Sequence, residues 1–204
     1  MSDLLTDKAP SRSESPLMAT RRIRLRVIND GDSKFIYQLM TSPYAGGRVR
    51  FAGATPSPDK IAASLWDSVL AQFIVERVQQ PEQLGLVAIT SPNFRDGFAY
   101  LSVVGSSKAQ GIGLVAEAAL LCFHYAFTTW PLRKIYMEST EESYKGFSSG
   151  LDRFFQEEGR LRQHTFWNGA YMDLLILAVY RETWAHYAPR MLKRLCRGGK
   201  SKIH

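Results

Sequence analysis

The stretch Gln110-Gly111-Ile112-Gly113 decides the fold, because it joins a predicted strand to a predicted helix. The strand is indicated by the aromatic and β-branched residues from Phe98 to Val104 (FAYLSVV). The helix is indicated by the length and apolar density of Leu114 to Thr128 (LVAEAALLCFHYAFT). Glycines let backbone N–H groups approach a phosphate closely, and the helix dipole places partial positive charge at the first turn. We therefore predict that a pyrophosphate-containing cofactor binds at this turn.

A nicotinamide dinucleotide is one candidate cofactor for this turn. Gly111-x-Gly113-x-x-Ala116 is a short form of the dinucleotide fingerprint, and Glu138 lies near the place expected of a ribose-binding acid. Against it, five residues from Gly105 to Ala109 separate the strand from the glycine pattern. The preceding chain also has the pattern of antiparallel hairpins and not that of a doubly wound sheet. A plain strand-to-helix turn without any ligand is a further interpretation.

The net charge is concentrated at the C-terminal end of the chain. The 204 residues carry a formal net charge of +7, and the stretch from Pro189 onward contains six basic residues and no acids. Residues 1–188 therefore carry a net charge of only +1. We predict a disordered segment over residues 1–20, one compact domain over 21–188 and a basic tail over 189–204. Such a tail is a candidate contact for a ribosome or nucleic acid, although it is more often simply solvated.

The composition is that of a globular domain with a hydrophobic core, with 45% hydrophobic and 22% charged residues. No stretch has the length of a transmembrane helix, and the start does not have the profile of a signal peptide. Cys122 and Cys196 are far apart, so we expect reduced thiols in a cytoplasmic protein without membrane contact. The four histidines have no metal-site spacing, and we predict no metal.

Two early helices are predicted after an opening strand. In Arg22 to Val27 the apolar and basic residues alternate, which indicates a strand whose arginines face solvent. A turn over residues 29–32 starts a short helix over 34–40. A second helix starts at Ser57, with Pro58 at its first position. Its apolar stripe is formed by Ile61, Leu65, Trp66, Val69 and Leu70.

The rest of the pattern indicates a mixed sheet with helices on its faces. Asn168-Gly169 is the strongest hairpin signal in the chain. The apolar run Leu174 to Val179 predicts an interior strand, because both of its faces are hydrophobic. The other predicted elements are strands at 73–78, 84–90, 133–138, 160–167 and 171–180, a helix from Ser143 to Gln156 closed by Gly159, and a basic helix over 181–197.

The pattern Gln/Arg-x-x-Gly-x-Gly/Ala, here Gln110 to Val115, resembles the acyl-CoA pyrophosphate loop of the GNAT N-acetyltransferase superfamily. Its sixth position is Val115, where that family prefers Gly or Ala. The resemblance extends from about Arg22 to Trp184 and is closest to the ribosomal-protein N-terminal acetyltransferase branch. Its supporting segments are Arg-x-Arg-Leu-Arg, Phe155-x-x-Glu158-Gly159 and Tyr171-x-Asp173…Arg181-x-x-Trp184. It implies an α+β GNAT fold, with a mixed central sheet of about six or seven strands flanked by helices on both faces.

The resemblance also implies acetyl-CoA, or another acyl-CoA, as the cofactor. Its pantetheine is expected to run between the strands at 98–104 and 133–139, held by backbone groups of the first strand. Its pyrophosphate is expected at the amides of the turn. The predicted cofactor-binding residues are Val103, Val104, Gln110, Gly111, Ile112, Gly113, Leu114, Val115, Ala116 and Ser143.

The acceptor side is implied by the same resemblance. In the GNAT fold the two early helices and their linking loop form one wall of the acceptor site. The substrate-side candidates here are Tyr44, Arg48, Arg50, Phe51 and Trp66. For each of these residues, plain packing or solvation is the competing interpretation.

The catalytic residues of the resembled branch are missing from this sequence. Its serine near the sulfur falls on Gly146, three residues after Ser143, and its glutamate base falls on Thr165. Candidate substitutes are Glu138, Thr140, Tyr144 and His164; the histidine is chosen because an imidazole suits base work at neutral pH. The competing interpretations are that Glu138 is a surface strand residue, that Tyr144 is a packing residue and that His164 is a half-exposed strand residue.

The predicted function is therefore an N-acyltransferase. It transfers an acetyl or other short acyl group from acyl-CoA to a primary amine, on a protein N-terminus or a small molecule, by direct attack of the amine. The alternatives are a non-catalytic acyl-CoA-binding module, motivated by the missing serine and glutamate, and a nicotinamide-dinucleotide enzyme. The oligomeric state is left open.

Overall fold

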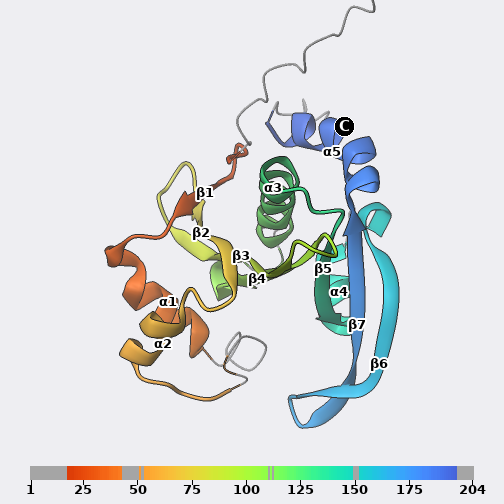
Figure 1. The fold of residues 1–204 in the computed structure, drawn as a ribbon. Helices are drawn as coiled ribbons and strands as arrows, with labels where there is room; N and C mark the ends of the chain where they lie inside the picture. The colour runs from red at the N-terminus through yellow and green to blue at the C-terminus, as the bar shows by residue number, and fades with distance from the viewer. Residues whose placement is uncertain are drawn as a thin grey trace, which may run out of the picture.

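The computed structural model describes residues 18–42, 51, 53–109, 111, 113–148 and 152–196. Within them, seven strands form one sheet in the order β1-β2-β3-β4-β5-β7-β6 (Figure 1). Only β4 and β5 pair in parallel; the other neighbours are antiparallel. The predicted mixed sheet of six or seven strands is confirmed. The strands are β1 (Ile23–Val27), β2 (Val69–Arg77), β3 (Gln83–Asn93), β4 (Phe98–Gly105), β5 (Lys134–Thr140), β6 (Gln156–Trp167) and β7 (Ala170–Tyr180).

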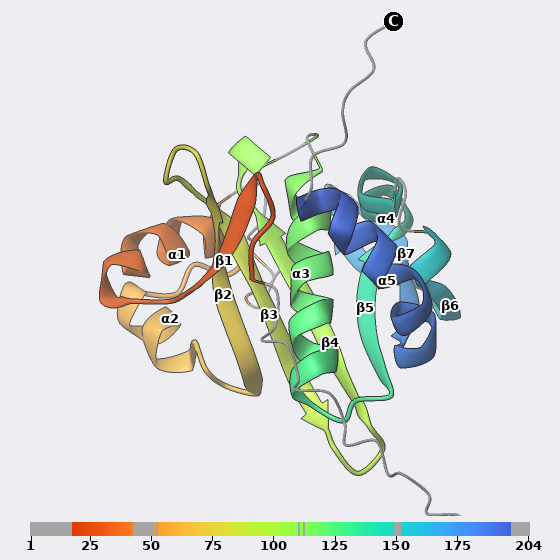
Figure 2. The same ribbon diagram turned by 90° about the horizontal axis from the view of Figure 1, so that it is seen from above.

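Helices cover both faces of the sheet, as predicted (Figure 2). On one face α1 and α2 pack against Ile74, Leu86 and Val104, which come from β2, β3 and β4. On the other face α3 and α5 form the main core, where Phe123 and Trp184 are buried. The helices are α1 (Ser33–Met40), α2 (Pro58–Ser64), α3 (Leu114–Thr129), α4 (Glu141–Ser148) and α5 (Arg181–Cys196), with short 3-10 turns η1 (Asp30–Asp32), η3 (Ser107–Ala109) and η4 (Asp152–Phe154).

The strongest local signals are confirmed. Asn168 and Gly169 both have left-handed backbones, with φ of 50° and 81°, which a two-residue hairpin between right-twisted strands requires. They join β6 to β7 in the long hairpin at one edge of the sheet (Figure 1). The apolar strand β7 lies between β5 and β6, so the prediction of an interior strand is also confirmed.

The second early helix is shorter than its apolar stripe predicts. Its start is correct, because the Ser57 hydroxyl accepts the Lys60 N–H at 3.4 Å and Pro58 follows. The helix ends at Ser64, however, and Val69 pairs with Thr90 as part of β2. Pairing with β3 buries these residues better than another helical turn would, so tertiary contacts override the local pattern.

The predicted helix from Ser143 to Gln156 is wrong at both ends. The helix α4 begins at Glu141, and Thr140 is its cap, since the Ser143 N–H donates to Thr140 Oγ1 at 3.3 Å. It ends at Ser148, and Gln156 already pairs with β7 as the start of β6. Gly159 lies inside that strand and closes no helix. Strand pairing with the apolar β7 outweighs a helix that carries a glycine.

Both predicted tails contribute ordered residues to the domain. Residues 1–17 and 197–204 lie outside the described part of the chain. Thr20, assigned to the disordered segment, is buried and accepts the Ile23 N–H at 3.1 Å. Residues 189–196, assigned to the basic tail, continue α5, where Leu192 is buried. In the described part of the chain, every helix is too short or too polar to cross a membrane.

Candidate functional site

The two parallel strands at the centre of the sheet separate after a short paired segment. β4 and β5 form three residue pairs, Phe98 with Lys134, Ala99 with Ile135 and Tyr100 with Tyr136. Beyond them, β4 remains paired with β3 as far as Gly105, and β5 with β7 as far as Thr140. Their facing edges, residues 101–105 and 137–140, are not paired with each other in the described structure. An extended ligand between the two edges would therefore have backbone groups to bind on both sides.

The glycine turn at the end of β4 has the geometry of an anion site. Gly111 and Gly113 have left-handed φ angles of 72° and 73°, which only glycine adopts readily. A Cβ atom at Gly111 would have nothing within 4 Å, so the turn is open on that side. Gly113 is the N-cap of α3 and has no side chain with which to cap it. The first N–H groups of α3 are therefore available to a ligand. Gln110 and Ile112 lie outside the described residues.

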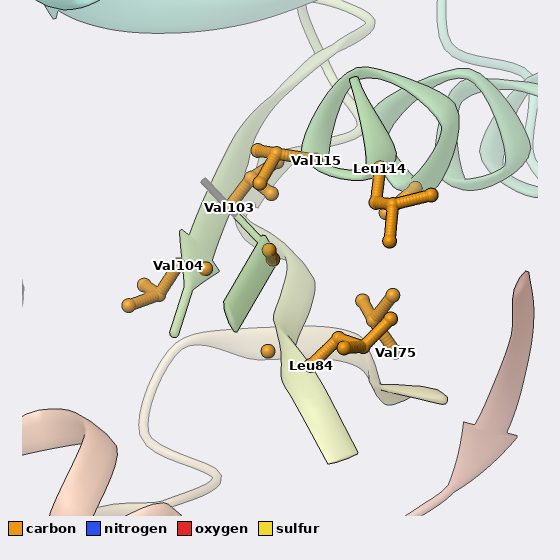
Figure 3. A pocket seen from close by; sticks show the side chains of 10 residues that line it. Val75, Leu84, Val103, Val104, Leu114 and Val115 are labelled. Carbon is orange, nitrogen blue, oxygen red and sulfur yellow. The ribbon is translucent and has the colours of Figure 1, made fainter. Parts of the chain in front are cut away.

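The valine that departs from the resembled pattern is accommodated by a glycine. A Cβ atom on Gly105 would lie only 2.7 Å from Val115 Cγ2, so Val115 fits because residue 105 has no side chain. Figure 3 shows Val103, Leu114 and Val115 around a small void beneath the turn. Its volume of about 10 Å³ has no room for a cofactor. The side chains of Val103, Leu114 and Val115 therefore pack below the turn, and only the backbone groups of these residues are suited to bind a ligand.

Sequence reasoning missed an arginine beside this turn. Arg22, predicted to be a solvated strand residue, contacts buried Glu117 in the first turn of α3 at 2.7 Å. Thr20 donates a second hydrogen bond to this carboxylate at 2.9 Å. The guanidinium Nη2 is 3.6 Å from the position that a Cβ atom on Gly113 would take. Arg22 thus neutralises the acid at the helix N-terminus, which removes a negative charge from the edge of the anion site.

Glu138 is the predicted catalytic residue closest along the sheet to the point where the strands part. It is exposed and lies two residues beyond Tyr136, on the same face of β5. Burial and the charge of Glu138, with a smaller contribution from Tyr136, raise the pKa of Tyr100. Glu138 and Tyr100 therefore face the same space.

The other two predicted catalytic residues have different surroundings. Tyr144 is half-buried on α4 and packs edge-on against Phe155, with ring centroids 5.9 Å apart. His164 is exposed on edge strand β6, two strands away from β5. The register of β6 shifts between Leu161 and Thr165, so His164 lies in an irregular segment. Leu174 of β7 pairs with Leu161 on one side and with Thr140, the last residue of β5, on the other, so His164 lies beyond the end of β5. The structure does not bring this imidazole to the parted strands.

The remaining predicted residues also have defined places. The hydroxyls of Ser143 and Thr140 are hydrogen-bonded at 3.0 Å, at the start of α4 directly after β5. Phe51 is half-buried and packs against the cluster formed by α1 and α2. Trp66 lies in the turn after α2 with 56% of its surface exposed. Tyr44, Arg48 and Arg50 lie outside the described part of the chain.

A charged cluster lies next to the paired residues of β4 and β5. The sequence analysis singled out Glu158 as part of the resembled pattern but did not predict this cluster. The Lys134 ammonium contacts both oxygens of Glu158, at 2.9 and 2.7 Å, and the Tyr136 hydroxyl donates to the same carboxylate at 2.8 Å. Tyr180 donates a further hydrogen bond to it. Burial opposes ionisation of Glu158, but these hydrogen bonds outweigh it and lower the pKa to about 2. Both oxygens of this carboxylate therefore accept hydrogen bonds from groups of the protein itself.

A larger recess of about 770 Å³ lies between α1, the β2–β3 turn and η3. Its charged side chains are paired with one another or with Asp32: Arg26 contacts Asp32 at 2.8 Å, and Lys108 contacts Glu82 at 2.6 Å. We therefore place the site at the parted strands, which carry unpaired backbone groups, and not in the larger hollow.

No protein-family model matches the chain. Spermidine N(1)-acetyltransferase of Escherichia coli K12 is 26% identical over 172 residues, covering 79% of this chain and 88% of that protein. The Vibrio cholerae enzyme of the same name is 27% identical over 157 residues, covering 75% and 90%.

Solved structures of the Vibrio cholerae enzyme have the same fold. Spermidine N-acetyltransferase in complex with CoA and spermine has a TM-score of 0.70 and 24% identity, covering 80% of this chain and 98% of that one. A dodecameric structure in an intermediate state has a TM-score of 0.66 and 25% identity, covering 80% and 96%.

The chain thus has the fold of these N-acetyltransferases, and the predicted GNAT fold and enzyme class, an acetyl-CoA-dependent N-acetyltransferase, are confirmed. Among proteins of this class, those similar to it are spermidine acetyltransferases. The predicted membership of the ribosomal-protein branch is not supported, and neither is ribosome or nucleic-acid contact through the basic tail. The dinucleotide alternative fails on topology, since a doubly wound sheet requires several parallel neighbours.

Proposed function

We propose that this protein transfers an acetyl group from acetyl-CoA to a primary amine of a polyamine such as spermidine, by direct attack of the amine. The observation that carries the proposal is the separation of β4 and β5 in front of an open glycine turn at the start of α3. The amine class is that of the spermidine acetyltransferases to which the chain is similar.

The residues present fit acetyl-CoA at this place. The N–H groups at Gly113 and the first turn of α3, which no side chain at Gly113 caps, suit a pyrophosphate, and Arg22 cancels the negative charge of Glu117 beside them. Backbone groups of Val103 and Val104, on the unpaired edge of β4, suit the amides of a pantetheine. The bound cofactor supplies the thioester that the amine attacks. Backbone N–H groups aimed at its carbonyl would stabilise the negative charge that develops there.

On the acceptor side we propose that Glu138 attracts and orients the amine. A protonated amine is drawn to a carboxylate, yet it must lose its proton before it attacks. The exposed position of Glu138 gives that proton a route to solvent. Tyr144 and Ser143, at the start of α4, remain candidates for contact with the cofactor, whereas the position of His164 on the edge strand argues against a catalytic role.

A thiol-release assay tests the proposal. Purified protein with acetyl-CoA is offered spermidine, spermine, monoamines and peptides with free N-termini, and we expect release of CoA thiol with the polyamines. Calorimetry with acetyl-CoA is run in parallel. Binding without turnover on any amine would instead support the non-catalytic module. That alternative is motivated by Gly146 and Thr165, which stand in the two positions where the resembled branch has its catalytic residues. Absence of binding at millimolar cofactor would contradict both.

A further inference from the structure

We propose that Phe98, Tyr100 and Tyr136, together with Glu138, form a subsite for a second, unreacting ammonium group of the acceptor. This inference rests on the proposed function and adds a specificity element to it. The amine that reacts would lie where the strands part, and the distal ammonium would lie against the aromatic rings.

The three rings form a compact patch at the last paired residues before the separation. Their centroids are 5.3 Å apart for Tyr100 and Tyr136, 5.6 Å for Phe98 and Tyr136, and 6.2 Å for Phe98 and Tyr100. All three side chains are half-exposed. They lie on the face of the sheet that α1 and α2 cover, because Phe98 and Tyr100 alternate in step with Val104, which packs in the cluster with these helices. The patch therefore borders the predicted acceptor wall.

The charges around the patch favour a cation. Aromatic faces attract ammonium groups through the ring quadrupole. Lys134 beside the rings is neutralised by Glu158, which leaves the carboxylate of Glu138 as the net charge of this group. Glu138 lies two residues beyond Tyr136 on the same face of β5, and Tyr136 pairs with Tyr100; the charge of Glu138 also raises the pKa of Tyr100. An uncharged or anionic tail would gain nothing from this arrangement.

The protein already holds one alkylammonium by the same means. Lys134 Nζ lies 4.4 Å from the centroid of the Tyr136 ring and 5.4 Å from that of Tyr180. Glu158 completes this internal site with a charge-assisted hydrogen bond of 2.7 Å. The ring of Tyr100 with Glu138 offers the same combination of aromatic face and carboxylate one step further along the strands. The Tyr136 hydroxyl is held by Glu158, so the shared ring is fixed in place.

Steady-state kinetics with a matched amine pair test the subsite. Spermidine is compared with butylamine, which has a reactive amine but no second cation. For Tyr100→Leu we expect the KM for spermidine to rise roughly tenfold, a typical range for one cation–π contact. We expect kcat, and the KM for butylamine, to stay near the wild-type values. Tyr100→Phe retains the ring and should bind spermidine nearly as well as the wild type.

Controls separate this result from general damage and from failure of the proposed function. Glu182→Gln removes an exposed carboxylate from α5, on the opposite side of the sheet, and should change neither KM. Calorimetry of spermidine with the cofactor-free protein measures the subsite even without turnover, and the affinity should fall with added salt. Equal losses for both amines would overturn the inference. A fall in kcat for Tyr100→Leu without a rise in the KM for spermidine would also overturn it, because the ring would then act on the reaction and not on the distal ammonium. Acetyl-CoA binding with no turnover of any amine would instead contradict the proposed function.

Discussion

Gly113 is the residue on which the cofactor site depends most directly. Its φ of 73° is costly for any L-residue with a β-branched side chain, by about 1–2 kcal/mol. An added side chain would also approach the Arg22 guanidinium. We predict that Gly113→Val weakens acetyl-CoA binding at least about tenfold, a change of about 1.4 kcal/mol, when measured by calorimetry. Gly169→Val is the matched control, because Gly169 has a φ of 81° and open space around it but lies in the β6–β7 hairpin. Equal affinities for the two variants would contradict this role.

Arg22 has a structural and an electrostatic effect that can be measured separately. Glu117 has only 6% of its surface exposed. When Arg22 is removed, Thr20 is the side-chain hydrogen-bond donor that remains to this carboxylate among the described residues. We predict that Arg22→Met lowers the free energy of unfolding by about 1–3 kcal/mol and weakens acetyl-CoA binding in calorimetry. Arg24→Met is a milder control, since its partner Glu76 retains Arg26 at 3.4 Å. If Arg24→Met weakened cofactor binding as much, the effect would be one of net charge and not of position.

At the scale of elements, the Lys134–Glu158 pair links β5 to β6 across β7 and makes stability depend on acid pH. The pKa of Glu158 is lowered from its usual 4.5 to about 2 in the folded protein. A depressed folded-state pKa contributes stability that is present above pH 4.5 and is lost as the pH falls toward 2. We predict that Glu158→Gln is less stable than the wild type near pH 7 in urea unfolding, and that this gap narrows between pH 4.5 and 2. A gap that does not change over this range would show that the pair contributes little. Glu182→Gln, which leaves the Lys134–Glu158 pair intact, is the control.

Elements defined by local signals were predictable, and those defined by strand pairing were not. The buried helix α3 and the Asn168-Gly169 hairpin carry their own length, apolar pattern and turn residues, and both match the structure. The ends of α2 and α4 do not, because Val69 and Gln156 gain more by pairing with β3 and β7 than by extending a helix. The same division applies to the site. The glycine turn is contiguous in sequence, whereas Tyr100, Tyr136 and Glu158 meet only after β4, β5 and β6 assemble.

At the scale of the whole molecule, the sheet consists of two parts with a narrow connection. Strands β1 to β4 and strands β5, β7 and β6 are joined through three residue pairs, with α3 packed across β1, β3 and β4 and in contact with α4 and α5. A ligand between the parted edges would contact both parts at once. Acetyl-CoA binding should therefore stabilise the whole domain, by about 2.7 kcal/mol at a hundredfold excess over its Kd, and not only the turn that holds its phosphates.

Hydrogen exchange resolves where that stabilisation arises. We predict that acetyl-CoA slows exchange of backbone amides in residues 101–105 and 137–140, on both parted edges, as well as in the first turn of α3. In the described structure the two edges are not paired with each other, so a ligand that bridges the gap changes the protection of these amides most. Amides of β1, at the far edge of the sheet, serve as the internal control and should change only through global stabilisation. Protection confined to the glycine turn would show that the ligand binds at the helix alone and does not enter between β4 and β5.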